Sequence, residues 1–486
     1  MYSSNGLSVE DFSMSQMEEP AAGKQKQPRR DASISRRNFV RRTAAVAAFT
    51  IVPRHVLGGS GYVPPSRKLN IAGIGVGGQG GGDINNVATE NIVALCDVDQ
   101  TRAADTFKRF PKAAKYSDFR KMLEKEDKNI DAIVIATPDH VHAAATMMAI
   151  KMGKHVYCEK PLTYSVYEAR KVTNTARQTG VATQMGNQGH SGEGIRLICE
   201  WIWDGAIGPV RQAHVWTTHA VWPQGMERPK ETPPVPQTLD WDLWLGPAPY
   251  RPYNPAYLPM LWRGWWDFGT GALGDMGCHN LDPVFFALKL GYPTSIEASC
   301  SIFVPTVTWD KPFNTEAYPQ ASIVRYEFPQ RDKLPPVEII WYDGGLMPPR
   351  PKELEPGRRL GDKLGGAIFI GDKGTLICNS YGNEPRLIPE TKMKNYQRPP
   401  KSIPRSPGHQ REWVEACKGG KPAGSNFEYA GLLTEVVLLG NIAVRMSLQL
   451  QEKGVRLTYD PSGMKITNLP EANAFIQRQY RQGWTL

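Results

Sequence analysis

Short apolar runs alternate with helical patterns in the part of the chain before about residue 190. Stretches at 141–152 and 164–178 have the apolar spacing of helices. The apolar runs that we interpret as strands lie at 69–74, 91–96, 130–136, 155–158 and 181–185. Because strands that are apolar throughout are typical of a sheet covered on both faces, residues 67–189 are predicted to form a parallel sheet between helices.

Later runs alternate apolar and polar residues, which is typical of strands with one covered face. They lie at 210–217, 295–303, 321–328 and 337–342. Long helical patterns follow at 408–416 and 429–447. We therefore expect an α/β protein whose second domain, residues 190–486, is α+β with a largely antiparallel, open-faced sheet.

Composition narrows the class of protein. The 486 residues carry a formal net charge of +10, but no stripe of Lys and Arg is interleaved with aromatic residues, so nucleic-acid binding is not expected. Seven cysteines are scattered without a C-x-x-C pair. This is neither a disulfide framework nor a zinc pattern, and no metal site is predicted.

Residues 1–66 are interpreted as a leader, an export signal and a linker. The sequence S-R-R-N-F-V-R at 35–41 is typical of a twin-arginine signal, and an apolar run of ten residues follows at 43–52. A membrane-spanning helix needs about 20 apolar residues, so no permanent membrane span is expected. The prediction is export through the twin-arginine machinery to the periplasm; a basic tail without a targeting role is the alternative.

A glycine-rich turn follows the first predicted strand. Gly73, Gly75 and Gly78 fit G-x-G-x-x-G, in which the first glycine permits the tight turn, the second lets the backbone approach a pyrophosphate, and the third permits close helix packing. Asp97 ends the second strand, where a carboxylate accepts hydrogen bonds from ribose hydroxyls and repels a 2′-phosphate. The pattern predicts NAD rather than NADP; a glycine loop without a ligand is the alternative.

Two further strand ends carry polar residues at the edge where ligands bind in open α/β sheets. Thr137 and Pro138 follow the third strand, and the same residues also suit the start of a helix. Lys160 follows the fourth strand, where its charge would help an alkoxide to form on a reacting hydroxyl. A surface lysine before a proline turn is the alternative.

Asp275 and His279 lie four residues apart in G-A-L-G-D-M-G-C-H-N-L-D. On a helix this spacing places both side chains on one face, so that the carboxylate can orient the imidazole. A neutral imidazole held in this way is a good general base near pH 7. Together with the glycine turn, the pair indicates removal of a hydride and a proton from an alcohol carbon.

The combined motifs resemble those of the Gfo/Idh/MocA oxidoreductase family, which includes glucose–fructose oxidoreductase and inositol dehydrogenase. The motifs are G-x-G-x-x-G, C-D-V-D, T-P-x-x-x-H, E-K-P, G-N-Q and G-x-x-x-D-x-G-x-H, over residues 68–290. The resemblance implies a Rossmann NAD-binding domain, contact between Lys160 and the reacting hydroxyl, and an Asp275–His279 acid/base pair in which His279 takes the proton. A tyrosine acts instead in some relatives. The residues implied to bind NAD are Gly73, Gly75, Val76, Gly77, Gly78, Asp97, Thr137, Pro138, His142, Glu159, Lys160, Asn187 and Gln188.

Tryptophans gather just before the Asp275–His279 segment, at 241, 244, 262, 265 and 266. Aromatic faces stack on the C–H faces of sugars, but packing between two domains is an equal expectation. Arg263 would bond a cofactor or substrate oxygen, or else form a salt bridge. The candidate substrate residues are Trp262, Arg263, Trp265 and Trp266.

The resemblance implies an NAD(H)-dependent oxidoreductase that acts on a hydroxyl of a sugar, sugar derivative or polyol. Because export would remove the enzyme from cytoplasmic NAD, the cofactor is expected to be tightly bound. A redox-neutral glycosidase or lyase that works through a transient keto-sugar is the alternative, and a non-catalytic NAD-binding protein is the third hypothesis. A homo-oligomer that pairs through the second domain is also implied.

Overall fold

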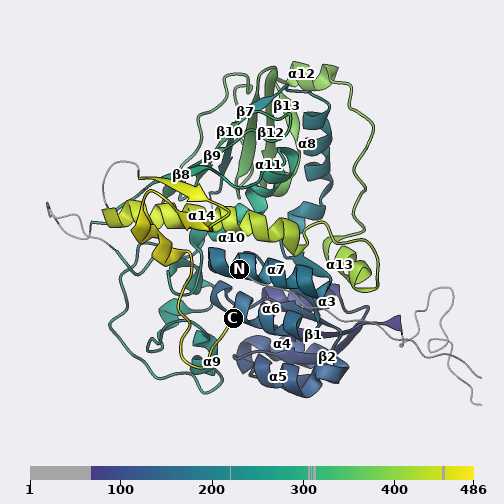
Figure 1. Ribbon diagram of the computed structural model, residues 1–486, viewed down its shortest axis with the longest axis vertical. Helices are drawn as coiled ribbons and strands as arrows, with labels where there is room; N and C mark the ends of the chain where they lie inside the picture. The colour runs from purple at the N-terminus through teal and green to yellow at the C-terminus, as the bar shows by residue number, and fades with distance from the viewer. Residues whose placement is uncertain (1–66, 219, 305–306, 308, 310–313, 451–454) are drawn as a thin grey trace, which may run out of the picture. The chain divides into compact units, whose positions relative to one another are not determined.

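The computed structural model describes residues 67–486, apart from 219, 305–306, 308, 310–313 and 451–454 (Figure 1). The predicted leader, the twin-arginine motif and the short apolar run fall in residues 1–66 and lie outside the described residues. Export therefore stays a prediction.

The first sheet has six parallel strands in the order β3-β2-β1-β4-β5-β6. They are β1 (Asn70–Ile74), β2 (Asn91–Cys96), β3 (Ala114–Tyr116), β4 (Ala132–Ile135), β5 (His155–Cys158) and β6 (Thr183–Met185). The helices between them are α3 (Gln79–Asn86), α4 (Gln100–Arg109), α5 (Phe119–Glu126), α6 (Asp139–Lys151) and α7 (Val166–Thr179). Every residue of β4 is buried, and alternate side chains enter two different apolar clusters. The predicted parallel sheet covered on both faces is confirmed.

Polar residues at the helix ends explain why these helices begin and end where they do. The Asp99 side chain accepts hydrogen bonds from the backbone N–H groups of Thr101 and Arg102 and so caps α4. Ser165 and Glu168 form a capping box at the start of α7, and Gly180 ends that helix in the left-handed region with φ of 69°.

The second sheet has nine strands in the order β13-β12-β11-β7-β10-β9-β8-β14-β15. They are β7 (Val210–Trp216), β8 (Ser295–Cys300), β9 (Ser322–Phe328), β10 (Val337–Tyr342), β11 (Gly366–Gly371), β12 (Gly374–Asn379), β13 (Arg386–Ile388), β14 (Arg456–Asp460) and β15 (Lys465–Ile466). Only β7 and β10 pair in parallel among these described strands, and the other neighbours are antiparallel. The expected largely antiparallel sheet is confirmed.

The second sheet is less open than the term open-faced implies. One face packs against α14 (Phe427–Leu450) through β8 and β9. The other face carries an apolar cluster that includes Trp216, Ile340 and Ile368. Leu354, from the segment before β11, is buried in that cluster, and Leu360 packs against it. The Pro- and Gly-rich segment before β11 thus covers part of this face.

Helix α14 joins the two sheets. It contacts α7 beside the first sheet as well as β8 and β9 of the second, and Figure 1 shows it in yellow-green between them. By length and composition α14 could cross a membrane, but 83% of its apolar window is buried within the protein. Its continuous apolar sequence is therefore explained by contacts on several sides.

Further helices belong to the later part of the chain. They are α8 (Glu193–Trp203), α9 (Trp241–Leu245), α10 (Gly271–Asn280), α11 (Asp282–Ala287), α12 (Glu390–Asn395) and α13 (His409–Cys417). Helix α13 returns to the first sheet, where the Trp413 ring lies 5.8 Å from the ring of Tyr157. A chain division at residue 190 therefore separates the sheets but not their cores.

Candidate functional site

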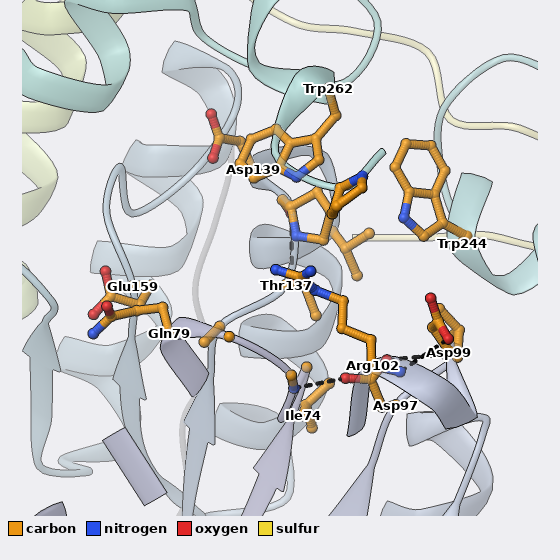
Figure 2. Close-up of a pocket in the computed structure, with 18 of the residues that line it drawn as sticks. Ile74, Gln79, Asp97, Asp99, Arg102, Thr137, Asp139, Glu159, Trp244 and Trp262 are labelled. Atoms are coloured by element: carbon orange, nitrogen blue, oxygen red, sulfur yellow. Dashed lines mark hydrogen bonds between the residues drawn. The ribbon is translucent and has the colours of Figure 1, made fainter. Parts of the chain in front are cut away.

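A cavity of about 460 Å³ lies at the carboxyl ends of the first sheet's strands. Its floor contains residues that follow β1, β2, β4 and β5, including Gly75, Asp97, Thr137 and Lys160. Its other side is formed by later segments, and Figure 2 shows Trp244 and Trp262 facing the strand ends across the space. A cavity at this edge is where open α/β sheets bind ligands.

The glycine turn uses a different register from the predicted one. Gly73 lies inside β1, and a Cβ there would lie 2.8 Å from the Ile84 side chain of α3. The tight turn is made by Gly75, with φ of 75°, and a Cβ at Gly80 would lie 1.9 Å from the Gly75 carbonyl oxygen. The set Gly75, Gly77 and Gly80 also reads G-x-G-x-x-G, and these positions fulfil the turn, approach and packing roles.

Asp97 lies beside this turn. Its two carboxylate oxygens accept hydrogen bonds from the backbone N–H groups of Gly77 (2.9 Å) and Asp99 (3.0 Å). Burial raises the pKa of Asp97, and the backbone hydrogen bonds oppose that effect. Arg102 lies at the same end of the cavity, where a Cβ on Gly77 would meet its Cγ at 2.5 Å (Figure 2).

Several residues predicted to bind the cofactor line the cavity. They are Gly75, Gly77, Gly78, Asp97, Thr137, Pro138, Glu159, Lys160 and Gln188. Gln188 donates a 2.7 Å hydrogen bond to Glu159, and burial, together with Asp83, holds the pKa of Glu159 well above its usual range.

Other predicted cofactor residues lie behind the cavity wall. The His142 ring nitrogens lie 2.7 Å from the Pro161 carbonyl oxygen and 2.8 Å from the Thr137 carbonyl oxygen. Burial lowers the pKa of His142 to about 4, and the neutral ring, which has one N–H, donates to one of these two carbonyls. Asn187 is buried and donates to Asp282, and Val76 packs in the core with Gly73 beside it. These side chains support the site without lining it.

The predicted pairing of Asp275 with His279 is not formed among the described residues. Asp275 Oδ1 instead accepts 2.7 Å hydrogen bonds from Lys160 Nζ and from Arg263 Nε. Burial would raise the pKa of Asp275, but these two cations lower it well below its usual range. Asp275 therefore positions two cations, because each attracts a carboxylate more strongly than a neutral imidazole does.

His279 nevertheless lies at the cavity next to that ion cluster. Its Nδ1 is buried with no hydrogen-bond partner among the described residues, and its ring centroid lies 4.5 Å from that of Tyr381. Burial, followed by the charge of Lys160, lowers the pKa of His279 well below its usual range. The imidazole is thus neutral and able to accept a proton.

Two of the predicted substrate tryptophans belong to the core. Trp265 is 1% exposed and its Nε1 donates to the Ala256 carbonyl. Trp266 is 4% exposed and packs against the ring of Tyr318. Trp262 does line the cavity, together with Arg263, whose guanidinium lies 4.1 Å from the centre of the Trp262 ring.

Three cavity residues escaped the sequence reasoning. Tyr381 lies in the 3₁₀ turn η6 (Ser380–Gly382) and has φ of 59°. No sequence pattern predicts this backbone conformation for a tyrosine. Asp139 follows Pro138, and burial raises its pKa to about 7, a consequence of packing rather than of spacing. Arg102 stands five residues after Asp97 and could have been found by looking for a cation near the predicted ribose site.

The comparisons with known proteins follow the same division of the chain. Residues 68–187 match the NAD-binding Rossmann fold of an oxidoreductase family, and residues 210–303 match the C-terminal alpha/beta domain of that family. The chain therefore matches models of the Gfo/Idh/MocA oxidoreductase family in the region of the first sheet and in part of the region of the second sheet.

Individual relatives are distant. A levoglucosan dehydrogenase of Pseudarthrobacter phenanthrenivorans is 23% identical over 211 residues, which is 43% of this chain and 45% of that protein. A 2,7-anhydro-N-acetylneuraminate hydratase of Mediterraneibacter gnavus is 30% identical over 98 residues, 20% of this chain and 26% of the relative. The alignments therefore span less than half of these relatives.

A solved structure shares the fold over most of the chain. The WlbA dehydrogenase of Bordetella pertussis, solved with NADH and UDP-GlcNAcA, superposes with a TM-score of 0.53 at 17% sequence identity. The superposition covers 81% of this chain and 99% of that one. At this level of identity the likeness concerns the fold.

Proposed function

We propose that the protein is an NAD(H)-dependent oxidoreductase that acts on a hydroxyl group of a sugar, sugar derivative or polyol. The observation that carries the proposal is the meeting of Lys160 and His279 at the cavity that also receives the glycine turn. When bound, the nicotinamide cofactor supplies the acceptor or donor of hydride. Residues of this chain supply the binding, the orientation and the proton transfer.

The residues present fit a dinucleotide. Gly75 and Gly77 keep the turn free of side chains that would fill the space beside it, as the short distances to a hypothetical Cβ show. The amides that start α3 would receive the diphosphate. Asp97 would accept hydrogen bonds from the ribose hydroxyls, which favours NAD over NADP.

The proton chemistry follows from the two sides of the ion cluster. His279, neutral and buried, would take the proton from the substrate hydroxyl. Asp275 raises the pKa of Lys160 against the opposing effect of burial, so that the ammonium persists and stabilises the developing alkoxide. In the reverse direction the same imidazole, once protonated, returns the proton to the oxygen.

The test is to incubate the protein with NAD and each member of a carbohydrate panel, and to measure the formation of NADH by its absorbance at 340 nm. Replacing His279 by Ala should lower turnover by at least about a hundredfold, the usual contribution of a general base. A His279→Ala variant with full activity would refute the assigned role. Arg411→Ala, at an exposed position of α13 where the side chain pairs with Glu415 of the same helix, offers a control for handling and folding.

A second candidate is a redox-neutral lyase, hydratase or glycosidase that passes through a keto-sugar. This candidate is supported by the similarity to a 2,7-anhydro-N-acetylneuraminate hydratase. Incubation with a glycoside without added NAD separates the two: release of free sugar supports the second candidate, and stoichiometric reduction of bound NAD supports the first. A protein that binds NAD without turning over any carbohydrate would support the non-catalytic hypothesis.

We also propose that the protein is exported through the twin-arginine pathway with its cofactor bound, and that it forms a homo-oligomer. The Arg36-Arg37 pair supports export, and all seven cysteines are free in the fold, as suits a protein that folds before export. Replacing both arginines by Lys should leave the protein in the cytoplasmic fraction. Unchanged export of that variant would refute the proposal, and light scattering of the purified protein tests the oligomer.

A further inference from the structure

Arg263 is built into the cavity wall with part of its donor capacity unused. It lies in the 3₁₀ turn η5 (Leu261–Gly264), and its Nε donates to Asp275. Its two terminal nitrogens have no hydrogen-bond partner among the described residues. The side chain is 20% exposed, so these nitrogens reach the cavity without being free in solvent.

The guanidinium is held in place on two further sides. Its carbon lies 4.1 Å from the Trp262 ring centre and 5.5 Å from that of Trp222. Stacking on an aromatic face fixes the plane of a guanidinium, and Asp275 fixes the Nε edge. The two terminal nitrogens of a guanidinium held in this way can donate two parallel hydrogen bonds to a planar partner with two acceptor oxygens.

The charges around Arg263 do not balance. Lys160 and Arg263 share the single carboxylate of Asp275. Glu159, whose pKa burial holds well above its usual range, accepts hydrogen bonds from Gln188 and from the Lys160 backbone N–H. Asp139, whose pKa is about 7, accepts a 2.5 Å hydrogen bond from the Thr270 hydroxyl. Lys160 and Arg263 thus share one strongly ionised carboxylate, and Asp139 near Arg263 is only partly ionised at pH 7, so part of the positive charge remains for an incoming anion.

We infer that the substrate carries a carboxylate, as in a hexuronic acid or another sugar acid, and that Arg263 binds this group. The inference rests on the proposed function and specifies its substrate class. A carboxylate matches both the planar guanidinium and the remaining positive charge. A phosphate ester, with nearly two negative charges, would need a further cation at this end of the cavity, and Arg102 lies at the other end beside Asp97.

The test compares matched ligand pairs on the NAD-loaded protein by calorimetry, which requires no turnover. The probes are glucuronate against glucose, galacturonate against galactose, and glucuronate against its 6-methyl ester, with glucose 6-phosphate as the dianion. At least one acid should bind at least about tenfold more tightly than its neutral partner, equivalent to about 1.4 kcal/mol. Arg263→Gln should remove that preference, and Arg263→Lys should retain part of it.

Arg102→Gln is the matched control, because it removes another cation of the same cavity and should preserve the ratio between acid and neutral ligand. Should Arg263→Gln fail to fold, the ligand pairs on the unaltered protein still decide. Equal binding of acids and neutral partners, preference for the phosphate, no binding by any acid, or a preference that survives Arg263→Gln would each overturn the inference.

Failure of the inference and failure of the proposed function look different. Oxidation of neutral sugars without preference for acids leaves the oxidoreductase standing and removes the role of Arg263. Acid binding that depends on Arg263 without any change in NAD supports the carboxylate site and counts against the oxidoreductase.

Discussion

The ring of Tyr381 packs against the imidazole of His279, with centroids 4.5 Å apart, although the two residues belong to segments about a hundred positions apart. Tyr381 holds a backbone conformation with φ of 59°, which is costly for a residue other than glycine and persists when surrounding contacts enforce it. The contact keeps water from one face of the proposed base.

Removing this ring should therefore move the pH profile. In Tyr381→Ala, water would reach His279, and its depressed pKa would rise toward the ordinary value of about 6.5. Because only the neutral imidazole accepts a proton, the acidic limb of log kcat/KM should shift to higher pH. Tyr381→Phe keeps the ring, so its acidic limb should lie at the same pH as that of the unaltered protein. If the acidic limb of Tyr381→Ala also lies at that pH, the shielding role is contradicted.

Asp275 should contribute strongly to stability because it is buried and holds two cations. Asp275→Asn is expected to lower the free energy of unfolding by about 3 kcal/mol, the scale for breaking a buried ion pair. Urea denaturation measures the change. If the cost arises from cations left without a partner, adding Lys160→Met to Asp275→Asn should recover part of it, and a strictly additive double variant would argue otherwise.

Asp139 should make stability depend on pH. Its pKa is about 7 in the folded protein and 3.8 as the reference value, so between these pH values the folded state holds a proton that the unfolded state has lost. The free energy of unfolding should fall as pH rises from 4 to 7, by about 4 kcal/mol at most. Asp139→Asn should flatten this part of the profile measured by thermal unfolding, and an unchanged slope would exclude Asp139 as its source.

Two glycines of α3, Gly80 and Gly82, should respond differently to replacement by alanine. Gly80→Ala would place a Cβ 1.9 Å from the Gly75 carbonyl oxygen, so the variant should lose both thermal stability and NAD affinity. Gly82→Ala has nothing within 4 Å and should gain up to about 1 kcal/mol, since alanine favours helices. Equal melting temperatures for the two variants would contradict the close packing of α3 on the turn.

Cofactor preference should depend on Asp97. Replacing Asp97 by Ser removes the charge that would repel a 2′-phosphate and leaves Arg102 close by, so NADP should gain affinity relative to NAD by at least about tenfold. Fluorescence titration with each reduced cofactor measures the ratio. An unchanged ratio would mean that Asp97 serves the glycine turn alone, through its hydrogen bond to Gly77.

Hydrophobic pattern predicted both sheets because burial on two faces and burial on one face leave different periods in the sequence. The pattern did not predict β11 and β12, which both begin with a glycine and whose residues are buried in succession rather than alternately. Fold class could thus be inferred while part of the second sheet could not.

The structure places Asp97 and Lys160 at the cavity, as expected from their positions at strand ends, and their roles stay predictions. Site prediction was wrong where several partners compete: Asp275 has the helical spacing to reach His279, yet two cations from other segments bind it. Spacing along one helix cannot reveal partners that arrive from η5 and from the end of β5. For the same reason Trp265 and Trp266 could not be told from cavity residues.

Helix α14 packs against both lobes of the protein. Its buried side chains are shared between α7 beside the first sheet and β8 and β9 of the second, so the two lobes cannot swing apart like a hinge without tearing a common core. Entry to the cavity would then depend on movement of the segments that line it, among them Leu258–Arg263. A dinucleotide enclosed by so rigid a frame would behave as a resident prosthetic group, replaced far more slowly than the small molecules it serves.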